Sequence, residues 1–77
     1  TGIGLDVRTT LEGMQFYTAG FLTDRPGKEG ARYGRASGLC LETQHFPDAV
    51  NHPAFPSPVL RAGEEYRAST SWRFFVR

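Results

Sequence analysis

The residue whose setting points most clearly to chemistry in this 77-residue chain is Glu42, in the middle of the run Leu39–Gln44. If this run is a strand, alternation places Glu42 on one face together with Cys40 and Gln44. A charged carboxylate is costly to bury unless it is paired. Such a group can act as a general base, but it can equally pair with an arginine of a neighbouring strand, and the pattern alone favours that ion pair.

A second polar residue in a similar setting is Gln15, in the run Met14–Thr18. If both runs share a sheet face, Gln15 lies near Glu42 and can form hydrogen bonds with a polyol. Buried amides more often satisfy backbone groups, so Gln15 also fits a structural role. The two residues define a candidate binding or catalytic site without deciding between these roles.

Three other residues, His45, Asp48 and His52, invite comparison with a metal site. Their spacing, His-x2-Asp-x3-His, matches no closed zinc pattern, and Cys40 is too isolated to complete one. As the single cysteine, Cys40 cannot form an internal disulfide. It is also a weak candidate nucleophile, because no basic residue adjoins it. We therefore expect neither a metal nor a cofactor.

Alternating patterns predict the strands that position these residues. The clearest is Tyr66–Arg77, where we expect a long, half-buried antiparallel strand. Shorter strands are expected at Leu5–Thr10, Met14–Thr18 and Leu39–Gln44, and the first two are predicted to pair as a hairpin across Thr10–Gly13. With nine Gly and five Pro, a helical bundle is disfavoured. The sequence predicts an all-β fold of antiparallel strands.

Two connecting segments differ in kind. Thr23–Gly30 is polar, with one proline and two glycines, and is expected to be a loop. Phe46–Pro58 holds four prolines, which exclude a central strand or a helix interior. Because it also contains Phe46 and Phe55, we expect an ordered loop that packs its aromatic rings.

Length and charge limit the class of protein. The formal net charge is +1 and no basic block occurs, so we expect no nucleic-acid partner. No apolar run approaches the roughly 20 residues of a membrane span, so no membrane partner is expected either. Hydrophobic residues make up 39%, which argues against disorder. A chain this short buries only about 60% of its unfolded surface, so we expect a folded chain that is short of core.

Four stretches of the sequence form an ordered series of motifs: Gly13–Thr18, Ser37–Asp48, Asn51–Ser57 and Leu60–Tyr66. In order and spacing, these motifs resemble the aldose 1-epimerase (galactose mutarotase) family. They cover nearly the whole chain and correspond to the C-terminal portion of those enzymes.

The chain departs from the family pattern at a few turns. Ala19 and Gly20 stand where the family usually has Gly-Asn, and Gly34 and Ala62 stand where proline is common. These changes affect loops more than Glu42, so they bear on substrate preference rather than on the type of reaction.

The resemblance implies that residues 1–77 are the C-terminal segment of a large antiparallel β-sandwich, incomplete without upstream sequence. It implies an enzyme that interconverts the α and β anomers of aldohexoses such as glucose or galactose. Glu42 would be the general base that takes the proton of the C1 hydroxyl, and Gln15 would bind sugar hydroxyls. The histidine acid of the family lies upstream, so neither His45 nor His52 takes that role, and the isolated chain is expected to be inactive.

An alternative reading is a carbohydrate-binding or structural β-sandwich module without catalysis, because the pair of Gln15 and Glu42 suits either. The partners expected are an aldohexose and the missing N-terminal part of the same protein. Cys40 is expected to pack beside Glu42. The expected location is the cytoplasm, with the periplasm also open.

Overall fold

The computed structural model describes residues 2–77 and contains strands and short 3₁₀ turns but no α-helix among these residues. All strand pairs are antiparallel, so the all-β prediction is confirmed. No helix in this range has the length and apolar character of a membrane span. The elements follow one another in the order β1 (Ile3–Thr9), β2 (Gly13–Tyr17), β3 (Arg25–Pro26), η1 (Lys28–Gly30), β4 (Arg32–Tyr33), β5 (Cys40–Gln44), η2 (Ala49–Asn51) and β6 (Thr70–Val76).

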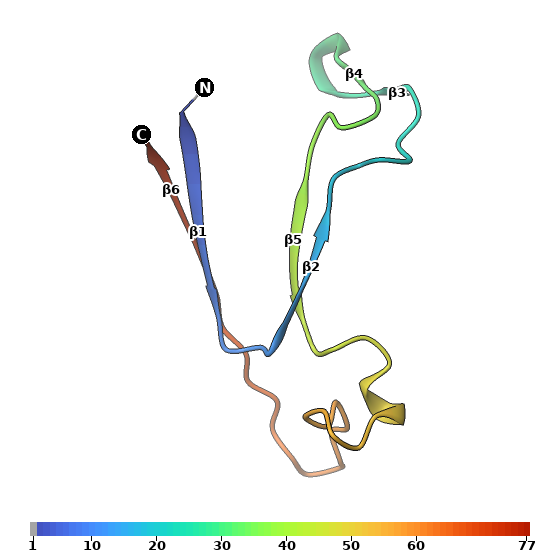
Figure 1. The fold of residues 1–77 in the computed structure, drawn as a ribbon, viewed down its shortest axis with the longest axis vertical. Coiled ribbons are helices and arrows are strands. Elements are labelled where there is room, and N and C mark those ends of the chain that lie inside the picture. Colours follow the sequence, from blue (N-terminus) through green and yellow to red (C-terminus); the bar gives the residue numbers. More distant parts are fainter. Residues whose placement is uncertain (1) are drawn as a thin grey trace.

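Two ribbons of paired strands dominate the structure. β1 pairs with β6 over its whole length, from Ile3 opposite Val76 to Thr9 opposite Thr70. β2 pairs in the same way with β5, and the small β3–β4 pair lies beyond the far end of this second ribbon. Figure 1 shows the two ribbons close together at one end and diverging toward the other, like the arms of a V.

The hairpin expected between the first two strands is wrong, because β1 and β2 belong to different ribbons. A tight hairpin turn favours residues with positive φ, and the corner between these strands offers no Gly, Asn or Asp. Gly13, which follows the corner, is the first residue of β2 and has no positive φ. A Cβ at Gly13 would come within 3.0 Å of the carbonyl oxygen of Gln44, so this glycine permits close pairing with β5.

The C-terminal strand is shorter and more exposed than expected. β6 begins at Thr70 rather than at Tyr66. Its predicted buried face is open, with Phe74 70% exposed and Val76 80% exposed. A half-buried strand needs a second layer over its apolar face, and no second layer covers this ribbon within residues 2–77.

The shortage of core is confirmed. Among residues 2–77, the buried apolar residues are Ala19 and Ala49 alone. The larger apolar side chains lie on ribbon faces or in loops, where one side of each remains in contact with solvent. The strands are therefore held mainly by their ladder hydrogen bonds and by contacts at the corner between the ribbons.

The two connecting segments agree with the predictions made from the sequence to different degrees. The segment expected to be a plain loop, Thr23–Gly30, contains β3 and η1. The ordered loop with packed aromatic rings is confirmed, because the ring centroids of Phe46 and Phe55 lie 5.0 Å apart. The centroid of the His52 ring also lies 5.0 Å from that of Phe55.

Two alanines adopt left-handed backbone conformations, and the same substitution by glycine is predicted to affect stability differently at each. Ala36 is exposed with a φ of 59°, whereas Ala19 is buried with a φ of 57°. We expect Ala36→Gly to stabilise a folded protein that contains these residues by about 0.5–1 kcal/mol, because relief of strain exceeds the entropy cost of glycine. Ala19→Gly should change stability little, since it also removes a buried methyl group worth about 0.8 kcal/mol.

Urea unfolding of the two variants and the unsubstituted protein measures the difference. Equal stabilisation by both substitutions would show that the buried methyl group of Ala19 contributes nothing.

Candidate functional site

The candidate site lies on one face of the β2–β5 ribbon. Gln15 and Glu42 are opposite each other in the antiparallel register, so their side chains leave the same face, as their sequence parity predicts. Both residues are exposed. Gln15 makes only a long hydrogen bond of 3.4 Å from its Nε2 to the carbonyl oxygen of Phe16. Within residues 2–77 the ion pairs use other carboxylates, so the expected alternative of an arginine paired with Glu42 is not seen there.

The opposite face of this ribbon is apolar apart from one threonine. The register pairs on that side are Met14 with Thr43 and Phe16 with Leu41. We call this side the rear face of the ribbon and the side of Glu42 the front face. A ribbon with a polar front and an apolar rear has one side for ligand or solvent and one for packing.

A cavity of about 320 Å³ lies at the end of the ribbon where Tyr17 pairs with Cys40, and neither Gln15 nor Glu42 lines it. The register pair Tyr17 and Cys40 contributes to its lining and lies two residues along the strands from Gln15 and Glu42. Cys40 is an exposed free thiol two residues from Glu42 on the same face of β5, and its packing beside Glu42 stays a prediction. Tyr33, in β4, also lines this cavity, and its approach depends on the β3–β4 pair that the sequence did not predict.

The residues compared with a metal site divide into two separate pairs. Nδ1 of His45 lies 2.8 Å from Oε1 of Glu12, and Nε2 of His52 lies 3.1 Å from Oδ2 of Asp48. Within residues 2–77, no three histidine, cysteine or acidic side chains come together as a metal-binding group.

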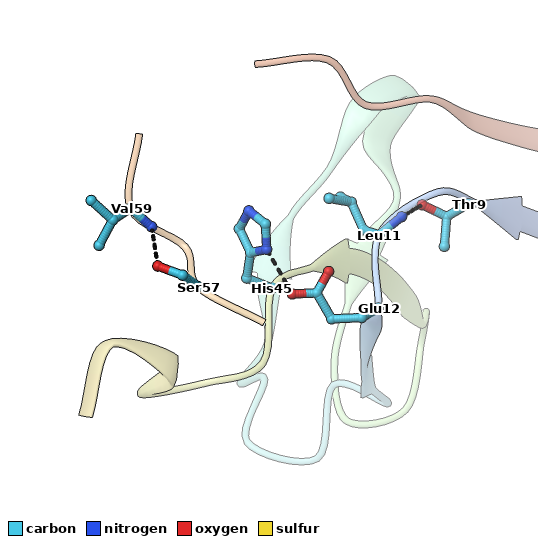
Figure 2. Close-up of polar contacts among 6 residues, drawn as sticks. All are labelled: Thr9, Leu11, Glu12, His45, Ser57 and Val59. Atoms are coloured by element: carbon cyan, nitrogen blue, oxygen red, sulfur yellow. Dashed lines mark hydrogen bonds and ion pairs between the residues drawn. The ribbon is translucent and has the colours of Figure 1, made fainter. Parts of the chain in front are cut away.

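The contact between Glu12 and His45 was missed by sequence reasoning. Figure 2 shows the His45 ring directed at the Glu12 carboxylate, near the corner where the Leu11 N–H bonds to Thr9. The His45 side chain is 32% exposed and that of Glu12 is 23% exposed. Because a carboxylate only accepts, Nδ1 of His45 is the donor. This hydrogen bond, followed by one from the backbone of Glu12, lowers the pKa of Glu12 below its usual 4.5.

The lowered pKa of Glu12 predicts a specific acid sensitivity. A carboxylate with a depressed folded-state pKa contributes stability above its unfolded value, here 4.5, and loses it as the pH falls through the folded value. We expect Glu12→Gln to flatten the decline of the unfolding free energy below pH 4.5. His45→Phe should have the same effect, because it removes the hydrogen bond that lowers the pKa of Glu12.

Urea unfolding of a folded protein that contains these residues, over a series of pH values on both sides of 4.5, measures these slopes. An unchanged slope in both variants would contradict a stabilising role for the pair.

Comparison with known proteins gives a consistent result along the chain. The model of the aldose 1-epimerase family matches residues 1–73. The galactose mutarotase of Mus musculus is 55% identical over 73 residues, which cover 94% of this chain and 21% of the mouse protein. The galactose mutarotase of Homo sapiens is 53% identical over 77 residues, covering 99% of this chain and 22% of the human protein. The aldose 1-epimerase of Escherichia coli (strain K12) is 42% identical over 74 residues, covering 94% of this chain and 21% of that protein. The chain therefore spans about a fifth of the length of these relatives.

Proposed function

Because this chain belongs to the aldose 1-epimerase family, we propose that it forms the part of an aldose 1-epimerase that supplies the general base, Glu42, and a sugar-binding amide, Gln15. The observation that carries the proposal is the position of these two residues opposite each other on an exposed strand face. Residues opposite each other on one face have Cβ atoms about 4.5–5.5 Å apart, so one pyranose ring can contact both side chains.

The proposed reaction needs a carboxylate that accepts a proton. Glu42 removes the proton of the C1 hydroxyl while an acid protonates the ring oxygen, so the bond between C1 and the ring oxygen breaks and an open-chain aldehyde forms. Rotation about the bond between C1 and C2 presents the other aldehyde face, and the reverse steps close the ring as the opposite anomer. Both protons return to the groups from which they came.

The acid in this proposal comes from outside the chain. His45 donates Nδ1–H to Glu12, and His52 pairs with Asp48 in a loop beyond β5. Neither histidine lies on the front face of the β2–β5 ribbon, which is the face that carries Glu42. A histidine on the remaining part of the fold fits the role better.

The exposed apolar faces support a large partner, the rest of the same β-sandwich. Thr43 lies on the rear face of the β2–β5 ribbon, and Thr70 shares its face of β6 with Trp72 and Phe74. Since the hydroxyls of Thr43 and Thr70 lie 2.9 Å apart, these apolar faces turn toward each other where the ribbons meet. Further strands that fill the space between them would bury residues such as Phe74, which is 70% exposed.

A graft into a complete relative tests the proposal. The 73 matched residues of the mouse galactose mutarotase are replaced by those of this chain, and polarimetry follows fresh α-D-galactose and α-D-glucose. We expect the graft to accelerate mutarotation, with the ratio for the two sugars giving the preferred hexose. A graft that unfolds cooperatively and binds galactose saturably, yet leaves mutarotation at its spontaneous rate, would replace the proposal by a non-catalytic sugar-binding module. The cytoplasmic location expected from the sequence stays a prediction.

A further inference from the structure

We propose that Thr43 and His45 are positioning residues. Thr43 anchors the rear face of β5 and His45 anchors its C-terminal end, so that the Glu42 side chain is fixed toward the sugar. The inference rests on the proposed function of Glu42. Thr43 is the next residue after Glu42, and His45 is the first residue after β5. Each is bound to a different part of the chain, which leaves the front face of the β2–β5 ribbon free.

The first attachment is a chain of threonine hydroxyls. Thr70 donates its hydroxyl proton to Oγ1 of Thr9 at 3.1 Å, so the contact of 2.9 Å with Thr43 has Thr43 as the donor. Oγ1 of Thr9 also accepts from the N–H of Leu11 at 3.1 Å. All three threonines are partly buried. This series of hydrogen bonds joins the rear face of β5 to both strands of the β1–β6 ribbon and to the corner between the two ribbons.

The second attachment is the hydrogen bond between His45 and Glu12. Gly13 and Gln44 form the register pair at this end of the β2–β5 ribbon. Glu12 directly precedes Gly13 and His45 directly follows Gln44, so the two residues occupy the next position of the antiparallel register. Their side-chain contact of 2.8 Å extends the pairing by one position. The His45 ring also lies 6.0 Å from the ring of Tyr66, in the segment that leads to β6.

These attachments act on the placement of the base. A slip of one residue between β2 and β5 would turn Glu42 to the rear face and separate it from Gln15. The ladder of a five-residue pair limits such a slip only weakly by itself, because two-stranded ribbons are marginal in water. A displacement of about 1 Å at a reacting group can cost on the order of a hundredfold in rate. Two side-chain attachments beside Glu42 therefore affect the chemical step more than the binding of the sugar.

The test uses matched substitutions in the grafted enzyme, with kcat and KM for galactose measured at a temperature where circular dichroism shows every variant fully folded. Thr43→Val keeps the shape of the side chain but removes its hydroxyl, and Glu12→Ala removes the hydrogen-bond acceptor of His45. We expect each to lower kcat by about tenfold while KM changes by less than about twofold. Thr43→Ser and Glu12→Gln keep the hydrogen bonds and should restore most of kcat.

Two control substitutions make the same chemical changes elsewhere. Thr23→Val alters an exposed loop threonine, and Asp48→Ala breaks the exposed pair with His52. Both should leave kcat unchanged.

Lower melting temperatures with kcat unchanged would reduce Thr43 and His45 to structural residues and overturn the inference, as would a rise in KM alone. If Glu42→Gln slows mutarotation but Thr43→Val does not, the inference fails and the proposed function stands. If Glu42→Gln leaves the rate unchanged, the inference and the proposed function are both wrong.

Discussion

Replacement of Glu42 by glutamine in the grafted enzyme is expected to lower the rate of mutarotation by about 10²–10⁴-fold. Glutamine keeps the size and the exposed position of the side chain, so strand pairing opposite Gln15 is retained. Its amide cannot take the proton of the C1 hydroxyl, so only the acid, the binding contacts and solvent water assist ring opening. Polarimetry with fresh α-D-galactose measures the loss as a first-order rate constant above the spontaneous reaction.

A glutamate outside the β2–β5 ribbon supplies the control for this substitution. Glu29 is an exposed residue of η1, so Glu29→Gln makes the same chemical change outside the β2–β5 ribbon. The rate of this variant should equal that of the unsubstituted graft. If Glu42→Gln were as active as Glu29→Gln while both remained folded, the base would be another group and the assignment of Glu42 would be wrong.

The isolated 77-residue chain is expected to show no cooperative thermal unfolding, whereas the grafted enzyme should unfold in a sharp transition. Its radius of gyration is 16.9 Å, compared with about 11 Å for a compact domain of this length. Since the buried apolar residues within residues 2–77 are two alanines, little hydrophobic free energy offsets the cost of ordering the backbone. Joining the chain to the rest of the proposed β-sandwich would cover the open ribbon faces and supply that free energy.

Circular dichroism melts and amide hydrogen exchange distinguish these outcomes. We expect a gradual melt and rapid exchange in the isolated chain, with protected β2 and β5 amides only in the graft. A dispersed amide spectrum with a two-state melt would contradict the need for the remaining fold. A melt that sharpens with protein concentration would instead show that a second copy of the chain covers the apolar faces.

Part of the candidate site could be predicted because strand parity is local. Alternation along a strand places Gln15 and Glu42 on sheet faces before any partner is known, and the register confirms that they share one face. The contact of Glu12 with His45 could not be found in this way, because 33 residues separate them and each is unremarkable in its own segment. The hydroxyls of Thr43 and Thr70 meet across 27 residues for the same reason.

The sequence by itself determined where the four longer strands lie apart from their exact ends, the packed aromatic loop and the family, since these depend on residue types at short spacing and on the order of motifs. It did not predict the short β3–β4 pair. Only the tertiary structure decided which strands pair. The corner after β1 leads into another ribbon because seven residues of β6 and five of β5 offer full-length partners elsewhere in the chain. It also decided that the apolar face of β6 is open, because burial depends on a second layer that residues 2–77 do not supply. Alternation predicts which side of a strand an apolar residue occupies, but covering that side requires other strands.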